Sequence, residues 1–156
     1  MPNTCDNWIR VSGEPTQLAE LQASPLQLDM FDPYPSDLPD HKSSDWILEH
    51  WGTKWIVEEL KVGSTVQLRP QPDGSLQTRF FSAWAPPVAF YNRLASAFPG
   101  IQVEYEYAEW GMGFVGYGKG GTKETEPTHL SYETKEELDE IKKSRVWQID
   151  VFNPHF

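Results

Sequence analysis

The chain has 156 residues, of which 38% are hydrophobic and 23% are charged, and its formal net charge is −10. A chain of this length typically forms one domain and buries roughly 70% of its unfolded surface, so it needs no disulfide or structural metal to fold. The acidic balance argues against direct binding to a nucleic-acid backbone or to an anionic membrane, because both require a basic surface. It leaves a basic protein as a suitable partner.

Cys5 is the only cysteine, which rules out an internal disulfide and fits a reducing compartment. The first residues lack the basic and apolar regions of a signal peptide, and no stretch approaches the roughly 18 apolar residues of a membrane span. We therefore expect a cytoplasmic protein without membrane contact. Seven Trp, six Tyr and eight Phe offset the low apolar share and predict an aromatic-rich core.

The first part of the chain predicts a strand, a helix and a long loop. Residues 8–12 favour a strand that ends at Gly13, and Pro15 fits the first turn of the helix that follows. Residues 24–43 contain four prolines and four aspartates, a composition that disfavours regular structure. We interpret 24–43 as an ordered insertion loop, because loops of about 20 residues are unusual in compact domains and are often functional.

A short helix and a strand are predicted next. Residues 44–51 are too apolar for a free surface helix, and Gly52 is typical of a helix end. Residues 53–62 are expected to form a strand. The helix has three candidate N-cap residues: Ser43, Ser44 and Asp45.

The centre of the chain is a strand–helix–strand unit over 78–107, preceded by a hairpin. Asp73-Gly74 between β-favouring runs is the strongest short-range hairpin signal in the chain. Residues 101–107 alternate between apolar and polar, which predicts a strand with one buried face and one open polar face. The helix between the strands has a buried stripe at helical spacing, made of Tyr91, Leu94, Ala95 and Phe98.

The glycine-rich segment that follows predicts a turn, a short strand over 114–117 and a flexible tip over 119–123. Thr134 and Glu137 have the spacing of a capping box, which indicates a helix start. Residues 146–152 alternate again and predict a terminal strand.

This order of elements predicts an α+β fold with a ferredoxin-like split βαβ antiparallel sheet, helices on one face of that sheet, and a C-terminal helix–strand extension. We expect one domain over 1–156. Within it, 24–43 is the insertion loop and 118–156 is the C-terminal extension.

Four short patterns occur over about residues 1–117: MPNTCDNWIRVSG at 1–13, WGTKW at 51–55, SAWAPP at 82–87 and YAEWGMGFVG at 107–116. Together they resemble one family, the YubB-like proteins of bacteriophages and conjugative plasmids. The resemblance implies a ferredoxin-like domain, a mobile-element origin and a cytoplasmic host setting, and it implies no catalytic residue. Thr4 stands where the family usually has Trp, and Ile56 stands where it often has Asp.

Carboxylates on and after the predicted strand are the first candidate site residues. Glu104 and Glu106 share one face, roughly 7 Å apart, where they can form a metal or acid–base pair or solvate the open face. Arg79 is expected on the same face. Glu109 precedes a glycine turn, so it either caps backbone N–H groups there or takes part in binding.

Other candidates are weaker. The four histidines lie in unrelated segments without the spacing of a zinc site, so we predict no metal and no cofactor. The glycine-rich segment lacks the spacing of a phosphate-binding loop, although Lys119 and Lys123 leave an anion nest as an alternative to a plain loop. Trp84 takes part in core and corner packing or, as the alternative, lines a groove with Trp110 for a protein partner.

Three functional hypotheses follow. The preferred one is a non-enzymatic mobile-element protein that binds a host or element-encoded protein, with its acidic surface opposing the basic cleft of a defence enzyme. The alternative is a small-molecule or nucleotide-binding domain with hydrolytic activity, and a deep pocket of mixed polarity would favour it. The third is a structural module that forms a homodimer through a sheet edge. No catalytic residue is predicted.

Overall fold

The computed structural model describes residues 3–61, 63–121 and 126–149. Four α-helices and two 3-10 turns accompany the sheet in this part of the chain. The helices are α1 (Pro15–Gln22), α2 (Ser43–His50), α3 (Val88–Ala97) and α4 (Lys135–Lys143), and the 3-10 turns are Leu28–Met30 and Asp40–Lys42. The strands are β1 (Thr4–Gly13), β2 (Ile56–Val57), β3 (Arg69–Pro70), β4 (Leu76–Ala83), β5 (Ile101–Glu109), β6 (Phe114–Gly120) and β7 (Thr128–Ser131).

The described strands form one seven-stranded antiparallel sheet in the order β2-β4-β1-β5-β6-β7, with β3 also paired to β4. The central order β5-β1-β4, followed by β2 and β3, is that of a split βαβ unit, in which α1 follows β1 and α3 joins β4 to β5. The predicted α+β ferredoxin-like fold is therefore confirmed. β6 and β7 extend the sheet beyond β5.

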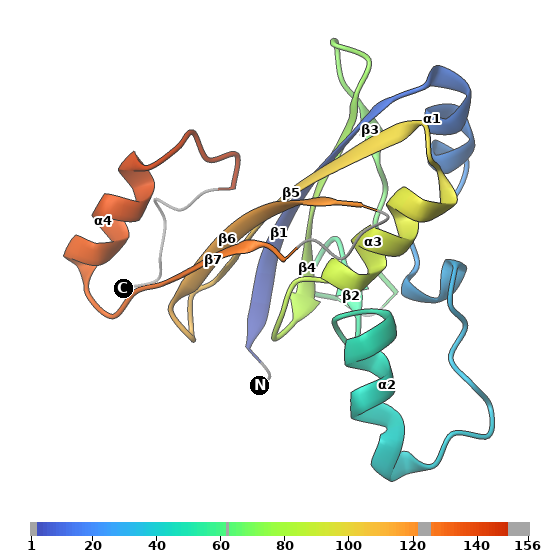
Figure 1. The fold of residues 1–156 in the computed structure, drawn as a ribbon, viewed down its shortest axis with the longest axis horizontal. Helices are drawn as coiled ribbons and strands as arrows, with labels where there is room; N and C mark the ends of the chain where they lie inside the picture. Colours follow the sequence, from blue (N-terminus) through green and yellow to red (C-terminus); the bar gives the residue numbers. More distant parts are fainter. Residues whose placement is uncertain (1–2, 62, 122–125, 150–156) are drawn as a thin grey trace.

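α1 and α3 cover one side of the sheet, which we call the helical face (Figure 1). Alternate residues of the strands enter the core on this face, among them Ile9 and Val11 of β1. The Glu14 carboxylate accepts hydrogen bonds from the backbone N–H groups of Thr16 and Gln17, at 3.0 and 2.9 Å, and so starts α1. The aromatic-rich core is centred on Tyr91, Tyr105 and Tyr107.

The glycine-rich segment contains the whole of β6, which is longer than the predicted strand. Its glycines alternate with larger residues and make room for the tyrosines of β5. A Cβ added at Gly116 would lie 2.2 Å from the Tyr107 ring, and one at Gly118 would lie 2.5 Å from the Tyr105 hydroxyl. The predicted flexible tip is wrong at residues 119–120, which belong to β6, while its residues 122–123 lie outside the described part.

The opposite side of the sheet, which we call the outer face, carries α4 (Figure 1). A second core joins Trp8, Ala108 and Val115 of the outer face to Leu138 of α4 and to Ile149 beyond it. The expectation of an open polar face is therefore wrong where the C-terminal extension covers the sheet. Alternation along β5 could not predict this, because the covering residues come from a distant segment.

Several local predictions can be compared with the structure. The hairpin at Asp73-Gly74 joins β3 to β4, and the capping box starts α4 with Thr134 and Glu137, so both are confirmed. The predicted N-cap of α2 is wrong, because the helix begins at Ser43 and Lys42 occupies the cap position without a side-chain hydrogen bond.

The structure differs from the predicted strands at three places. Of the residues predicted as a strand over 53–62, only Ile56–Val57 form one in the described part, and residue 62 lies outside it. Residues 146–149 are irregular instead of extended, and 150–152 lie outside the described residues. β7 was not predicted. No helix in the described part of the chain has the length and apolar character needed to cross a bilayer.

Candidate functional site

Strand pairing aligns two rows of side chains across the outer face. Each row runs perpendicular to the strands, so its members are direct cross-strand neighbours. The first row, which we call the Glu106 row, is Arg79, Trp8, Glu106, Tyr117 and Thr128. The second, the Glu104 row, is Gln77, Arg10, Glu104 and Lys119.

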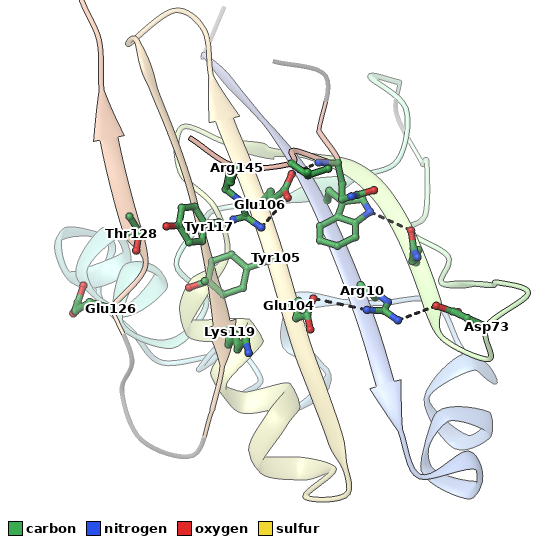
Figure 2. A pocket seen from close by; sticks show the side chains of 15 residues that line it. Arg10, Asp73, Glu104, Tyr105, Glu106, Tyr117, Lys119, Glu126, Thr128 and Arg145 are labelled. Atoms are coloured by element: carbon green, nitrogen blue, oxygen red, sulfur yellow. Dashed lines mark hydrogen bonds and ion pairs between the residues drawn. The ribbon is translucent and has the colours of Figure 1, made fainter. Parts of the chain in front are cut away.

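A pocket of about 560 Å³ lies over these two rows. Most of both rows form its floor, and residues just after α4 form one wall (Figure 2). We call that segment, 144–149, the C-terminal strap. Arg145, Val146 and Gln148 of the strap line the pocket, as do Asp73 of the β3–β4 hairpin and Glu126, which precedes β7.

Glu106 is the most buried charged residue of the pocket, with 1% of its surface exposed. Its Oε1 atom accepts hydrogen bonds from the backbone N–H groups of Gln148 and Ile149, at 2.7 and 2.9 Å. Its Oε2 atom lies 3.4 Å from Nη2 of Arg145. Burial raises the pKa of Glu106, while the two N–H groups and Arg145 act in the opposite direction. The carboxylate thus fastens the C-terminal strap to β5.

Arg145 is held by aromatic rings as well as by Glu106. Its guanidinium carbon lies 3.9 Å from the centre of the Tyr117 ring and 5.1 Å from that of Trp147. The Trp147 indole also packs edge-on against Tyr117. Figure 2 shows Arg145 and Glu106 pointing toward one another beside Tyr117. These contacts place the guanidinium at the wall of the pocket.

The Glu104 row carries alternating charge. Arg10 lies 2.8 Å from Asp73 and 4.0 Å from Glu104, and Lys119 is the cross-strand neighbour of Glu104 on the other side. Counted over the whole pocket, four acidic and three basic side chains give one negative charge in excess. The pocket is therefore of mixed polarity, with no concentration of positive charge.

The structure brings two of the predicted site residues together and separates a third. Glu104 and Glu106 share the outer face, as predicted, and both line the pocket. The interpretation that both solvate an open face is wrong for Glu106, which is buried. Arg79 lies in the Glu106 row but beyond Trp8, where it lines a smaller cavity with Glu58.

The remaining predicted residues lie at two corners of the sheet. Glu109 is buried and its Oε2 atom accepts the backbone N–H of Met112, so its capping role is confirmed. Trp110 donates a 2.9 Å hydrogen bond to Asp6 and packs against the second core. Trp84 is 55% exposed, with a φ of 67°, so core packing is wrong for this side chain.

Sequence reasoning missed Arg145, Tyr117 and Arg10. Arg10 is the cross-strand neighbour of Glu104 on the outer face. The sequence does not indicate the register of β1 against β5, and without that register Arg10 could not be assigned to the site. Arg145 carries no sequence signal, because the C-terminal strap has no periodic structure. Within the described residues, no group of three or more His, Cys, Asp and Glu side chains is arranged to hold a metal ion.

Comparison with protein families identifies the class of the fold. The family model described as a ferredoxin-like domain in Api92-like protein matches residues 65–150, which is more than half of the chain. The chain therefore belongs to this family. The matched region contains Glu104, Glu106 and the C-terminal strap, and the description names a fold without an activity. Comparison with curated proteins gave no match, and neither did comparison with solved structures.

Proposed function

We propose that this protein binds a small polar molecule in the pocket between the outer face and the C-terminal strap. The observation that carries the proposal is the buried Glu106 carboxylate, which faces Arg145 at the wall of a cavity of about 560 Å³. Pockets of roughly 300–1,000 Å³ with a few fixed polar groups are typical small-molecule sites. The proposal concerns binding and assigns no reaction.

The polar groups of the pocket are suited to orienting a ligand. Glu106 is fixed by two backbone hydrogen bonds before any ligand arrives, so little entropy is lost in ordering it, and Arg145 is held beside it by the Tyr117 ring. Arg10 and Glu104 lie farther along the floor and are half-exposed, so they face the solvent side of the pocket. A ligand with polar groups at both ends matches this arrangement.

A thermal-shift screen with a broad metabolite library tests the proposal, because a ligand of the folded state raises the melting temperature. Thr128→Trp fills the floor of the pocket from an exposed position of β7, and Ser131→Trp adds the same side chain at an exposed position of the same strand outside the pocket lining. We expect hits that Thr128→Trp abolishes and Ser131→Trp retains. A library without hits, or hits that survive Thr128→Trp, would overturn the proposal.

A second candidate is protein binding by a mobile-element protein, as the four sequence motifs suggest. The net charge of −10 suits a basic cleft, such as that of a host defence enzyme. Trp84 supports this candidate, because a bulky residue in the left-handed region is strained and this indole is 55% exposed. Exposed aromatic residues are frequent anchors of protein interfaces.

Capture from host lysate at low and high salt tests this candidate. We expect a partner that is retained at low salt, released at high salt, and lost when Trp84 is replaced by Gly. Capture that is independent of both salt and Trp84 would contradict it, as would the absence of any partner.

A further inference from the structure

Two buried polar atoms in the lining of the pocket have no hydrogen-bond partner among the described residues: Glu106 Oε2 and Arg145 Nη1. The Tyr105 hydroxyl is also unpaired within the described part, but its ring packs on Tyr91 at the helical face of the sheet. Buried polar atoms are nearly always paired, and each unpaired one costs about 1–3 kcal/mol. The position of Glu106 Oε2 and Arg145 Nη1 at one cavity points to a ligand group that pairs with both.

The Glu106 carboxylate and the Arg145 guanidinium have complementary hydrogen-bonding roles. A carboxylate oxygen can only accept a hydrogen bond, and a guanidinium nitrogen can only donate one. The neighbouring pair of atoms, Glu106 Oε2 and Arg145 Nη2, are 3.4 Å apart and belong to groups held from different sides, one by the C-terminal strap backbone and one by the Tyr117 ring. A ligand that satisfies both groups must present a donor beside an acceptor.

The charge of the pocket further restricts the class of ligand. Arg145 faces Glu106, and Arg10 faces both Asp73 and Glu104, so these two cations are balanced by carboxylates. The pocket as a whole has one acidic group in excess, and the protein carries a net charge of −10. A phosphate or carboxylate group would be repelled by this excess of negative charge.

We infer that the pocket accepts an uncharged molecule whose recognised group has an N–H donor beside a carbonyl acceptor, as in an amide, a lactam or a cyclic ureide. The donor bonds to Glu106 Oε2 and the carbonyl accepts from Arg145. The Arg145 side chain is 31% exposed and belongs to an irregular segment, so it can shift to admit the group. This inference rests on the proposed function and specifies its ligand.

Two sources supply such a group, a nucleobase edge and a carboxamide. The test uses uridine, guanosine and N-acetylglutaminamide as neutral probes, with uridine 5′-monophosphate, guanosine 5′-monophosphate and N-acetylglutamate as the matched anions. Binding is followed by NMR titration of the full chain, with the backbone amides of Gln148 and Ile149 as reporters, because both donate to Glu106. The probe that binds identifies the source.

We expect at least one neutral probe to shift both reporters and to bind at least about tenfold more tightly than its anion. Glu106→Gln retains an acceptor for the two backbone N–H groups but turns the second oxygen into a donor, so it should weaken that probe about tenfold or more. Glu20→Gln removes the same charge from the exposed surface of α1 and should leave the affinity unchanged.

The failures of this inference and of the proposed function can be told apart. If only anionic probes shift the reporters, or if Glu106→Gln binds the neutral probe as tightly as the wild type does, the inferred ligand class is wrong while the pocket remains a binding site. If none of the six probes shifts the reporters, the ligand class is again overturned. The proposed function itself fails only when the broad screen yields no ligand that Thr128→Trp blocks.

Discussion

Glu106 Oε2 lies 3.4 Å from Arg145 Nη2, and the other oxygen of the same carboxylate accepts the N–H groups of Gln148 and Ile149. One side chain of β5 therefore binds three residues of the C-terminal strap. Replacing Glu106 with Ala should lower the free energy of unfolding by about 2–4 kcal/mol, because two hydrogen bonds to a charged acceptor are lost. Glu106→Gln retains a neutral acceptor and should cost only about 1 kcal/mol.

Urea denaturation measures both losses, and hydrogen exchange at the Gln148 and Ile149 amides reports the C-terminal strap directly. In Glu106→Ala these two amides should lose protection more than amides in α3 do. Equal stability of the Ala and Gln variants would contradict the anchoring role of the carboxylate.

The stability contributed by Glu106 should depend on pH. Burial raises its pKa above the ordinary value of 4.5, so the folded protein retains this proton at pH values where the unfolded chain has released it. The contribution is therefore complete below 4.5 and is lost as the pH rises through the folded pKa. The free energy of unfolding of the wild type, relative to Glu106→Gln, should decrease from pH 4.5 toward neutrality. Denaturation curves of both proteins at several pH values measure this difference in the free energy of unfolding. A difference that stays constant or rises with pH would exclude a raised pKa of Glu106.

Gly116 should tolerate no side chain. A Cβ at this position would lie 2.2 Å from Cζ and Oη of Tyr107, and Gly116→Ala should destabilise the protein by about 1–3 kcal/mol through overpacking. Tyr107→Leu removes the two nearest clashing atoms and leaves the backbone oxygen of Thr128 at 2.7 Å, so the same glycine substitution should cost less in that background but still destabilise the protein. Gly111→Ala is the control, because a Cβ added there would lie 3.1 Å from its nearest neighbour, Oδ1 of Asn3. Additive losses in the double variant would show that the clash is not with Tyr107.

Trp84 should be replaceable by Gly at no loss of stability. Its φ of 67° is unfavourable for any residue with a Cβ, and its indole is 55% exposed. Trp84→Gly should be about 1 kcal/mol more stable than Trp84→Ala, because only Gly adopts this backbone conformation without cost. Thermal and urea denaturation of the two variants provide the comparison. If Ala proves as stable as Gly, the backbone at this corner is not strained.

Cys5 should be inert in the folded protein. The thiol is fully buried, and burial raises its pKa, so little thiolate forms and no reagent reaches it. A thiol-reactive dye should label the native protein at least about a hundredfold more slowly than the urea-unfolded chain. Similar labelling rates in the two states would place the thiol at the surface.

Much of the fold could be predicted because its signals are local. The capping box of Thr134 and Glu137, the turn at Asp73-Gly74 and the alternation along β5 each depend on neighbouring residues. β6 was predicted too short because glycine has no side chain with which to show alternation. Its length depends on the tyrosines of β5, which lie in another part of the sequence.

The candidate site was predicted only in part for a similar reason. The period of two in β5 correctly places Glu104 and Glu106 on one face. Their different surroundings are set by the C-terminal strap, whose docking depends on apolar contacts of Trp8 and Ile149 across the second core. No local pattern in residues 144–149 indicates that contact.

The spacing of glycines in β6 also limits how the sheet can assemble. Gly116 and Gly118 face the tyrosine side, while Val115, Tyr117 and Lys119 face the other. A slip of one residue against β5 would force those three side chains into the space that the Tyr105 and Tyr107 rings fill. A one-residue slip of β6 against β5 is therefore sterically excluded, and a single-residue deletion in β6 should be far more harmful than one in the β3–β4 turn.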